Sequence, residues 1–296
     1  MDEDLPPPEF VSVTVRADAH SPPTTAEVAT WQLGPASGDS RGDVVICHGT
    51  PWSSRMWWPL ARALNSTYRV FLWDMPGYGA SITTTAEAGV PVDLVAQRRR
   101  LTELIRLWGL ERPHVIAHDI GGAVALGAHL LEGTEFSSLH LSDIVTLPPW
   151  GSPFFRLVVD NESVFAALPP PLHQALVHAY ITGAGGPDFP QGWVDELTRP
   201  WSTPDGQAAF YAQIAALSPV DTEPISERLG QVRCPVRVGW GEDDPWLPVE
   251  QAGRLAEALP GPVDVTRFPG VGHLAVLEAP EAFAAEVTAW LTLGSA

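Results

Sequence analysis

The feature that most constrains the fold of this chain is a short segment, residues 115–122, which reads V-I-A-H-D-I-G-G. It predicts an apolar strand, a sharp turn at Asp119 and a helix that begins at Gly121. Ala117 and Gly121 place small residues two positions before and two after Asp119. A strained strand-to-helix turn that lifts one side chain above a parallel sheet needs this spacing. The usual occupant of such a turn is serine, so a carboxylate here predicts different chemistry.

The rest of the chain alternates strands and helices around this segment. The predicted strands are 10–16, 26–33, 44–47, 69–73, 114–117, 138–145, 235–240 and 263–268, and the predicted helices are 55–64, 92–107, 121–131, 249–259 and 281–293. This alternation predicts the α/β class, with a mostly parallel sheet that is covered by helices on both faces.

The alternation is interrupted by a block rich in proline, tryptophan and phenylalanine, residues 147–224. This block predicts helices joined by irregular loops, and we expect it to be an inserted helical cap. Residues 1–146 and 225–296 then form the core. Open α/β sheets bind ligands at the carboxyl ends of their strands, so the cap should cover that edge.

Composition and charge exclude several classes of partner. The 296 residues carry a formal net charge of −18, which disfavours binding to a nucleic-acid phosphate backbone. No apolar run is long enough to span a membrane, and the acidic start at residues 1–4 does not resemble a signal peptide. Two cysteines, Cys47 and Cys234, in predicted strands indicate buried thiols in a reducing compartment. We therefore expect a cytoplasmic protein with neither a nucleic-acid nor a membrane partner.

Three further motifs follow predicted strands, each at the strand's carboxyl end. They are His48-Gly49-Thr50-Pro51, the turn 240–244 that ends in Asp244, and residues 270–273, which end in His273. With Asp119 they give the chain order nucleophile, acid, histidine. In this order and placement the chain resembles the α/β-hydrolase superfamily over nearly its whole length, and the resemblance implies an α/β-hydrolase fold.

Within that superfamily, residues 118–122 (H-D-I-G-G) look like the branch with an aspartate nucleophile. That branch contains epoxide hydrolases, haloalkane dehalogenases and haloacetate dehalogenases. A carboxylate suits displacement at a saturated carbon with a good leaving group, because attack on an ester or amide carbonyl would form an uphill anhydride. The implied intermediate is an alkyl ester on Asp119, which an activated water then hydrolyses.

The second step requires a base and a set of oxyanion donors. The resemblance implies that His273 is the base and that Asp244 orients it, with Asp143, after the strand that follows the elbow helix, as the alternative acid. The backbone N–H groups of Thr50 and Ile120 are the candidate oxyanion hole. No histidine or cysteine spacing suggests a metal site, and no cofactor is expected.

The leaving group separates the members of the branch. Haloalkane dehalogenases are expected to place a tryptophan directly after the nucleophile, and haloacetate dehalogenases an arginine, where this chain has Ile120. Haloalkane dehalogenases also commonly have asparagine where this chain has Thr50. Both departures favour an epoxide, whose opening alkoxide needs O–H donors from the cap. Tyr211, on a predicted helix at 207–216, is the first candidate donor, and Tyr180 is the second.

The aromatic residues of the cap predict a mainly apolar pocket. Phe165 lies nearer than Tyr180 to the usual place of the first cap tyrosine, and Trp150, Trp193 or His178 are alternative N–H donors. The residues expected to line the pocket are Tyr180, Trp150, Trp52 and Phe165.

The sequence therefore predicts a hydrolase that converts a small hydrophobic epoxide and water to a diol through an ester on Asp119. A haloalkane or haloacetate dehalogenase is the alternative enzyme. A non-catalytic ligand-binding protein on a hydrolase fold is the alternative from another class, because fold alone does not establish function. The sequence leaves the oligomeric state open, with a homodimer as one option.

Overall fold

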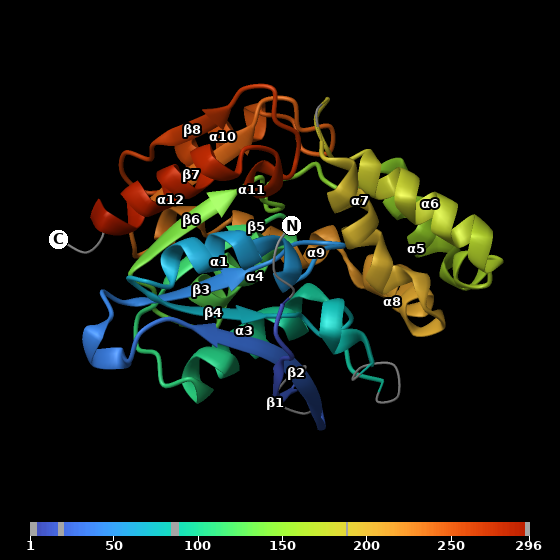
Figure 1. Cartoon of the computed structure of the whole chain (residues 1–296), viewed down its shortest axis with the longest axis horizontal. Helices are drawn as coiled ribbons and strands as arrows, with labels where there is room; N and C mark the ends of the chain where they lie inside the picture. Colours follow the sequence, from blue (N-terminus) through green and yellow to red (C-terminus); the bar gives the residue numbers. More distant parts are fainter. Residues whose placement is uncertain (1–4, 17–20, 84–88, 188, 294–296) are drawn as a thin grey trace.

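One eight-stranded sheet organises the protein (Figure 1), in the order β1-β2-β4-β3-β5-β6-β7-β8. The computed structural model describes residues 5–16, 21–83, 89–187 and 189–293, so the acidic start at 1–4 lies outside the described residues. The strands are β1 (Glu9–Arg16), β2 (Pro23–Leu33), β3 (Asp43–Cys47), β4 (Arg69–Trp73), β5 (His114–His118), β6 (Ser138–Ser142), β7 (Val236–Gly241) and β8 (Val265–Phe268). Among the described strands, the pairs β1–β2 and β2–β4 are antiparallel, and the other five pairs are parallel. The predicted α/β-hydrolase architecture is confirmed.

The burial of the strands explains their sequences. All five residues of β5 are buried, as are those of β6, because helices cover both faces of the central parallel strands. The edge strand β1 alternates exposed and buried residues along its second half, as expected for a strand with one face in water. Both cysteines are free and buried, in agreement with the sequence prediction.

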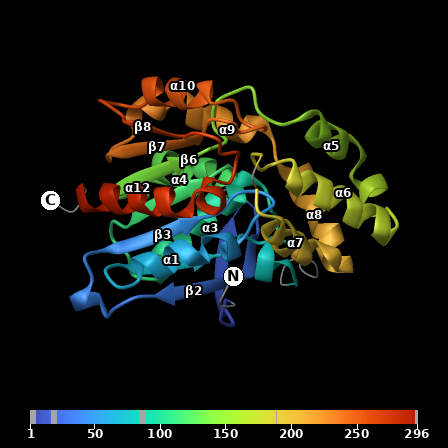
Figure 2. The ribbon, with the colours of Figure 1, turned by 45° about the horizontal axis from the view of Figure 1, so that its top comes forward.

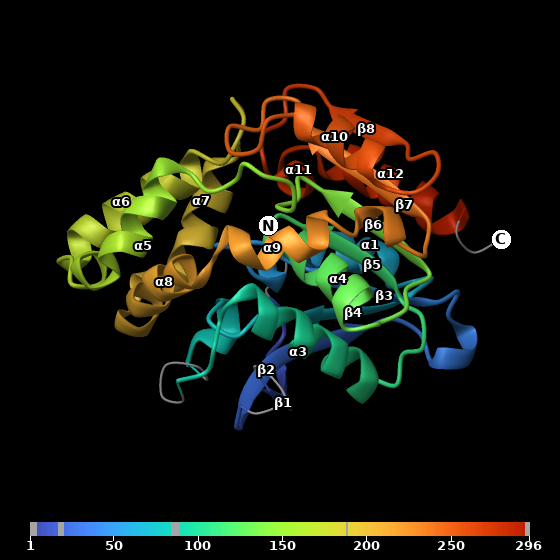
Figure 3. The ribbon, with the colours of Figure 1, turned by 180° about the vertical axis from the view of Figure 1, so that it is seen from behind.

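Helices cover both faces of this sheet. The α-helices are α1 (Trp58–Leu64), α3 (Leu94–Leu107), α4 (Ile120–Leu131), α5 (Pro153–Ala166), α6 (Pro170–Thr182), α7 (Gln191–Thr198), α8 (Pro204–Ala216), α9 (Pro219–Ser226), α10 (Glu250–Ala258), α11 (Ala275–Glu278) and α12 (Pro280–Leu293). Helices α1 and α12 lie on the face toward the viewer in Figure 1, and α3, α4 and α9 lie on the face seen in Figure 3. Among the described residues, no helix is long and apolar enough to cross a membrane.

Helices α5, α6, α7 and α8, here called the cap helices, form a group beside the sheet (Figures 1 and 2). The predicted boundary between residues 224 and 225 falls inside α9, which follows them. Ile225 of α9 is buried and packs over Gly127 of α4. This contact places the end of α9 against α4, which covers the sheet. The group of cap helices therefore ends with α8.

Two predicted elements differ from the observed ones at their ends. The strand predicted at 138–145 stops at Ser142, because Asp143 adopts a φ of 48°, which extended backbone cannot accommodate. The helix predicted from Arg55 begins as a 3-10 turn, Ser54–Trp57, and becomes α-helical at Trp58. Both differences are local and leave the order of the elements as predicted.

Candidate active site

Asp119 stands at the turn between β5 and α4, as the sequence predicts. Its backbone has φ 53° and ψ −128°, a conformation that residues other than glycine rarely adopt. The two following glycines are needed because the turn is crowded. A Cβ on Gly121 would lie 2.5 Å from the carbonyl oxygens of Cys47 and His48, and one on Gly122 would lie 2.4 Å from Ile144. The turn therefore presents the Asp119 side chain at the edge where the parallel strands end.

The Asp119 carboxylate is held in a defined orientation. Its Oδ1 accepts a hydrogen bond from the Thr50 N–H at 2.7 Å, and its Oδ2 lies 3.5 Å from Nε2 of His273. Burial alone would raise the pKa of Asp119, but the His273 side chain and the Thr50 N–H hold that pKa below its usual value. The carboxylate is therefore ionised at neutral pH. Ile120, the other predicted oxyanion donor, is the first residue of α4, where backbone N–H groups have no partner within the helix.

His273 is hydrogen-bonded to Asp244, as predicted. Its Nδ1 lies 2.7 Å from Oδ2 of Asp244, and Oδ1 of Asp244 accepts from the backbone N–H groups of Trp246 and Leu247 at 2.8 and 3.0 Å. Burial lowers the pKa of His273, but the charges of Asp244 and Asp119 outweigh it and raise that pKa well above its usual value. With Asp119 ionised, the imidazole is therefore protonated and lies between two carboxylates.

The alternative acid, Asp143, lies near this pair but has other partners. Its Oδ1 accepts from the Gly241 N–H at 2.8 Å, and its Oδ2 accepts from the Ser142 hydroxyl at 2.7 Å. Burial and the neighbouring charge of Asp244 raise the pKa of Asp143 well above its usual value, which favours its neutral form. The geometry thus favours Asp244 over Asp143 as the partner of His273.

Asp143, Asp244 and His273 are also a group among the described residues whose potential ligand atoms lie within 4.8 Å of one another. All four carboxylate oxygens already take part in hydrogen bonds, and one of these bonds joins His273 to Asp244. This donor set is therefore a hydrogen-bonded cluster that orients His273.

His118 contacts the backbone of His273. Its Nε2 lies 2.8 Å from the carbonyl oxygen of His273, and burial together with the His273 charge lowers the pKa of His118 to about 3. A neutral imidazole that donates from Nε2 fits this contact. His48 is similarly tied to backbone, since its Nε2 accepts from the Met75 N–H at 2.9 Å and its Nδ1 faces the Gly49 carbonyl.

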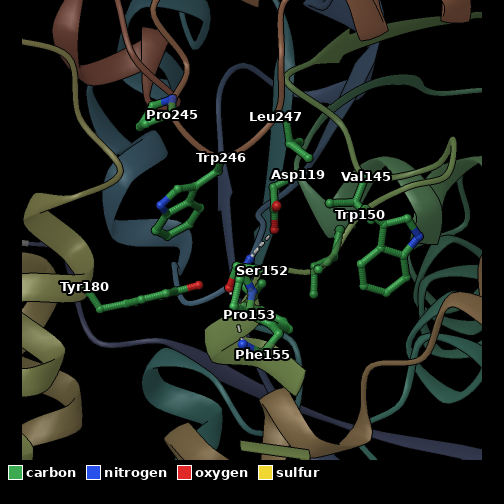
Figure 4. A pocket seen from close by; sticks show the side chains of 13 residues that line it. Asp119, Val145, Trp150, Ser152, Pro153, Phe155, Tyr180, Pro245, Trp246 and Leu247 are labelled. Atoms are coloured by element: carbon green, nitrogen blue, oxygen red, sulfur yellow. Dashed lines mark hydrogen bonds between the residues drawn. The ribbon is translucent and has the colours of Figure 1, made fainter. Parts of the chain in front are cut away.

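A cavity of about 260 Å³ opens above Asp119 (Figure 4). Its walls are mainly apolar and aromatic, and Thr50, Asp119 and Tyr180 supply polar atoms. The lining residues are Thr50, Asp119, Ile120, Val145, Trp150, Gly151, Ser152, Pro153, Phe155, Tyr180, Pro245, Trp246 and Leu247. Among these described residues none carries a positive charge. The cavity therefore brings the Asp119 carboxylate and the phenol of Tyr180 together in a mainly apolar space.

The match to a family model agrees with the fold and this arrangement. Residues 44–286 match the model of the "Alpha/beta hydrolase family". The chain belongs to the alpha/beta hydrolase family. A solved α/β-hydrolase-fold protein from Burkholderia ambifaria is 39% identical to this hydrolase, with a TM-score of 0.80 over 88% of this chain and 93% of that chain.

Two curated relatives carry more specific names. A protein of a Caulobacter species named "Putative carbamate hydrolase RutD" is 30% identical over 88% of this hydrolase and 93% of its own length. A fluoroacetate dehalogenase of a Burkholderia species is 27% identical over 78% of this hydrolase and 84% of its own length.

The structure places Tyr180 and Trp150 in the cavity wall of this hydrolase. In Figure 4 the Tyr180 hydroxyl points into the cavity, whereas the indole nitrogen of Trp150 points away from Asp119. That nitrogen donates to Oγ1 of Thr222 at 2.9 Å. The free phenol of Tyr180 is therefore better placed than the Trp150 N–H to meet a leaving group.

The expectation that Tyr211 faces the substrate is not met. Tyr211 is fully buried, its hydroxyl lies 2.9 Å from Nδ1 of His173, and its ring packs on Phe165 with a centroid distance of 5.6 Å. Neither Tyr211 nor Phe165 lines the cavity above Asp119. The reason is the rotation of α8, which turns Tyr211 toward α5 and α6 within the cap.

The other predicted pocket residue, Trp52, also lies outside the cavity lining. It is buried and stacks on Trp246 at a centroid distance of 5.7 Å, so it backs the wall that Trp246 forms. The alternative donors Trp193 and His178 lie elsewhere on the cap helices: Arg55 sits over the Trp193 ring, and the half-exposed His178 lies 3.8 Å from Asp195. Sequence reasoning missed Trp246, and its place two residues after Asp244 is a signal that could have identified it.

Proposed function

We propose that this hydrolase opens a small, uncharged epoxide on a hydrophobic substrate and releases the diol. The observation that carries the proposal is the placement of two groups in one cavity. The ionised Asp119 has Oδ1 fixed by Thr50, and the free Tyr180 hydroxyl points into the same space. A carboxylate attacks a saturated carbon productively, and a phenol can protonate the oxygen that leaves.

In the first step, Oδ2 of Asp119 forms a bond to an epoxide carbon as the carbon–oxygen bond of the ring breaks. Tyr180 donates its proton to the departing oxygen. Burial and the charge of Asp119 raise the pKa of Tyr180 well above its usual value, so the phenol is neutral before reaction and its anion readily takes a proton back. The His273 imidazolium supplies that proton through water in the cavity, which leaves His273 neutral and ready to act as a base.

In the second step, a water on Nε2 of His273 attacks Cγ of the ester and gives its proton to His273. The oxyanion that develops on Oδ1 already faces the Thr50 N–H, and the Ile120 N–H is the proposed second donor. Collapse of the tetrahedral intermediate breaks the bond between Cγ and the former Oδ2, and that oxygen takes the proton of the newly added hydroxyl and leaves as part of the diol. The carboxylate of Asp119 and the protonated His273 are then restored, so the cycle balances as epoxide plus water to diol.

The cavity favours an epoxide over a halide for three reasons. Ile120 provides no side-chain N–H for a halide, the Trp150 N–H is occupied by Thr222, and no described lining residue is basic. The lack of a lining cation also disfavours a carboxylate-bearing substrate such as fluoroacetate. The second candidate remains dehalogenation, which the fluoroacetate dehalogenase relative supports at 27% identity.

A product assay on a matched substrate panel tests this proposal. The panel contains uncharged aryl and alkyl epoxides, haloalkanes of the same size, fluoroacetate, and a simple carbamate because of the RutD relative. We expect diol formation from epoxides and neither halide nor ammonia release. Halide release without diol formation would overturn the proposal in favour of a dehalogenase, and ammonia release alone in favour of carbamate hydrolysis.

Two tyrosine variants test whether Tyr180 is the general acid that protonates the leaving oxygen. Tyr180→Phe should slow ring opening by about 10²–10⁴-fold, the usual contribution of a general acid. Tyr211→Phe is the matched control, since it removes a buried hydroxyl of the same cap that faces His173 and not the cavity. Equal losses in both variants would mean that Tyr180 acts only through the stability of the cap.

A further inference from the structure

Gln213 of α8 connects the cap to the loop that carries Thr50. The side chain is fully buried. Its Oε1 accepts hydrogen bonds from the Thr50 hydroxyl at 2.6 Å and from the Tyr78 hydroxyl at 2.7 Å, while its Nε2 donates to the Phe210 carbonyl at 3.0 Å. One amide thus satisfies two core hydroxyls, and its own orientation is fixed by the backbone of the cap helix.

Thr50 contacts both Gln213 and the candidate nucleophile, Asp119. Its hydroxyl donates to Gln213, and its backbone N–H donates to Oδ1 of Asp119 at 2.7 Å. The loop has little room to move, since a Cβ on Gly49 would lie 2.4 Å from Cβ of Asp119. A small displacement of Thr50 would therefore change the hydrogen bond to Oδ1 directly.

Tyr78 fixes the other side of the same amide. Its ring packs edge-on against His48 at 5.2 Å and against Trp201 at 6.2 Å, and the residue is fully buried. Gln213 is consequently held between a rigid aromatic residue of the core and the Thr50 hydroxyl. This leaves Thr50 as the partner whose position affects Asp119.

We propose that Gln213 is a positioning residue that sets the Thr50 N–H from the cap and accelerates ester hydrolysis more than ester formation. The inference rests on the covalent mechanism proposed above. In ester formation, negative charge leaves the Asp119 carboxylate, so a donor at Oδ1 stabilises the reactant more than the transition state. In ester hydrolysis, charge develops on Oδ1, and the same donor stabilises the transition state.

The test separates the two steps by rapid quench and intact-protein mass spectrometry, using an epoxide that the wild type turns over. Gln213→Leu and Thr50→Val each remove the side-chain hydrogen bond and keep the Thr50 N–H. Loss of a whole oxyanion donor costs about 10²–10³-fold, so a displaced donor should slow ester hydrolysis by about tenfold. Ester formation should change far less, so the alkyl-enzyme should accumulate in both variants.

Three further variants make the test specific. Thr50→Ser keeps a hydroxyl and should restore most of the hydrolysis rate that Thr50→Val loses. The Thr50→Val/Gln213→Leu double variant should be close to either single variant, because both changes remove the same contact. Gln207→Leu is the control on the same helix, since the side-chain amide of Gln207 donates to the carbonyls of Ala166 and Leu168 within the cap, and it should not change the ratio of the two steps.

Equal slowing of both steps in Gln213→Leu and Thr50→Val, or no rescue by Thr50→Ser, would overturn the inference. If Gln213→Leu does not fold, the Thr50→Val and Thr50→Ser pair decides alone, because it leaves the bond between Gln213 and Tyr78 intact. Failure of the covalent mechanism itself has a different signature. In that case no ester appears even when His273 is replaced, whereas failure of the inference leaves that ester in place and the ratio of steps unchanged.

Discussion

Replacing His273 with glutamine should stop the reaction at the ester. Glutamine fills much of the imidazole volume in this fully buried position but takes no proton from water at neutral pH. His273 acts as a base only in the second step, and the proton that it returns to Tyr180 after ring opening can come from water instead, so attack by Asp119 should continue. The enzyme should therefore convert one equivalent of substrate per active site and then stall.

The size of the effect follows from the geometry around His273. Its Nε2 faces Oδ2 of Asp119 at 3.5 Å, and its Nδ1 is fixed by Asp244 at 2.7 Å, so it is an oriented general base. Such a base is typically worth about 10²–10⁴-fold in rate, or about 3–5 kcal/mol of activation free energy. His273 also lowers the pKa of Asp119, so that pKa should rise in the variant. The assay is therefore run at about pH 8, where a carboxylate of raised pKa is still ionised.

The measurement is the intact mass of the variant after mixing with substrate. An epoxide adds its whole mass to Asp119, whereas a haloalkane adds its mass less that of the hydrogen halide, so the increment identifies the leaving group. The Asp119→Asn/His273→Gln double variant should show no adduct. His178→Gln, at a half-exposed cap position outside the cavity, should turn over like the wild type.

Two outcomes would refute this reasoning. Multiple turnovers at the wild-type rate in His273→Gln would show that His273 is not the base. A folded variant that neither turns over nor forms an adduct, although the wild type is active, would show that His273 is needed before the ester forms.

Three other predictions follow from the same geometry. Asp244→Asn should lower turnover by about 10²–10⁴-fold, whereas Asp143→Asn should have little effect because Asp143 is hydrogen-bonded to Gly241 and Ser142 and not to His273; a larger loss of turnover in Asp143→Asn than in Asp244→Asn would make Asp143 the partner of His273. In the ester, Asp119 has no charge, so the pKa of His273 falls from its raised value in the free enzyme. Protonation of His273 still slows ester hydrolysis at acid pH, because a protonated imidazole cannot act as a base. Single-turnover experiments should show the ester accumulating as pH is lowered, because the pKa of Asp119 lies below its usual value and ester formation persists; a common inflection for both steps would contradict this. Gly121→Ala should cost about 1–3 kcal/mol of stability through its clash with two carbonyl oxygens, and an unchanged unfolding temperature would argue against the elbow geometry.

The sequence predicted the parts of the site that depend on local geometry. The turn at Asp119 could be located because small residues must flank a crowded strand-to-helix turn, and those constraints lie within five residues. Asp244 and His273 could be located because each follows a parallel strand, and such strands end at one edge of the sheet.

The remaining features depend on packing between distant segments. Tyr211 and Tyr180 both lie on cap helices, and only the rotation of each helix against its neighbours decides which one faces Asp119. Asp143 and Asp244 follow neighbouring strands, so the turn after each strand, and not the strand itself, decides which carboxylate meets His273. Gln213 contacts Thr50 across 163 residues of sequence, a separation at which no local pattern gives a signal.

The central claim, that Asp119 forms a covalent ester, is tested most directly by oxygen labelling. A single turnover of the wild type in ¹⁸O-water is followed by mass spectrometry of the product and of the peptide that contains Asp119. The mechanism predicts an unlabelled product and one ¹⁸O in the Asp119 carboxylate, because the product takes Oδ2 and water attacks Cγ. A product that carries ¹⁸O after the first turnover, with Asp119 unlabelled, would contradict the claim and indicate direct attack by water.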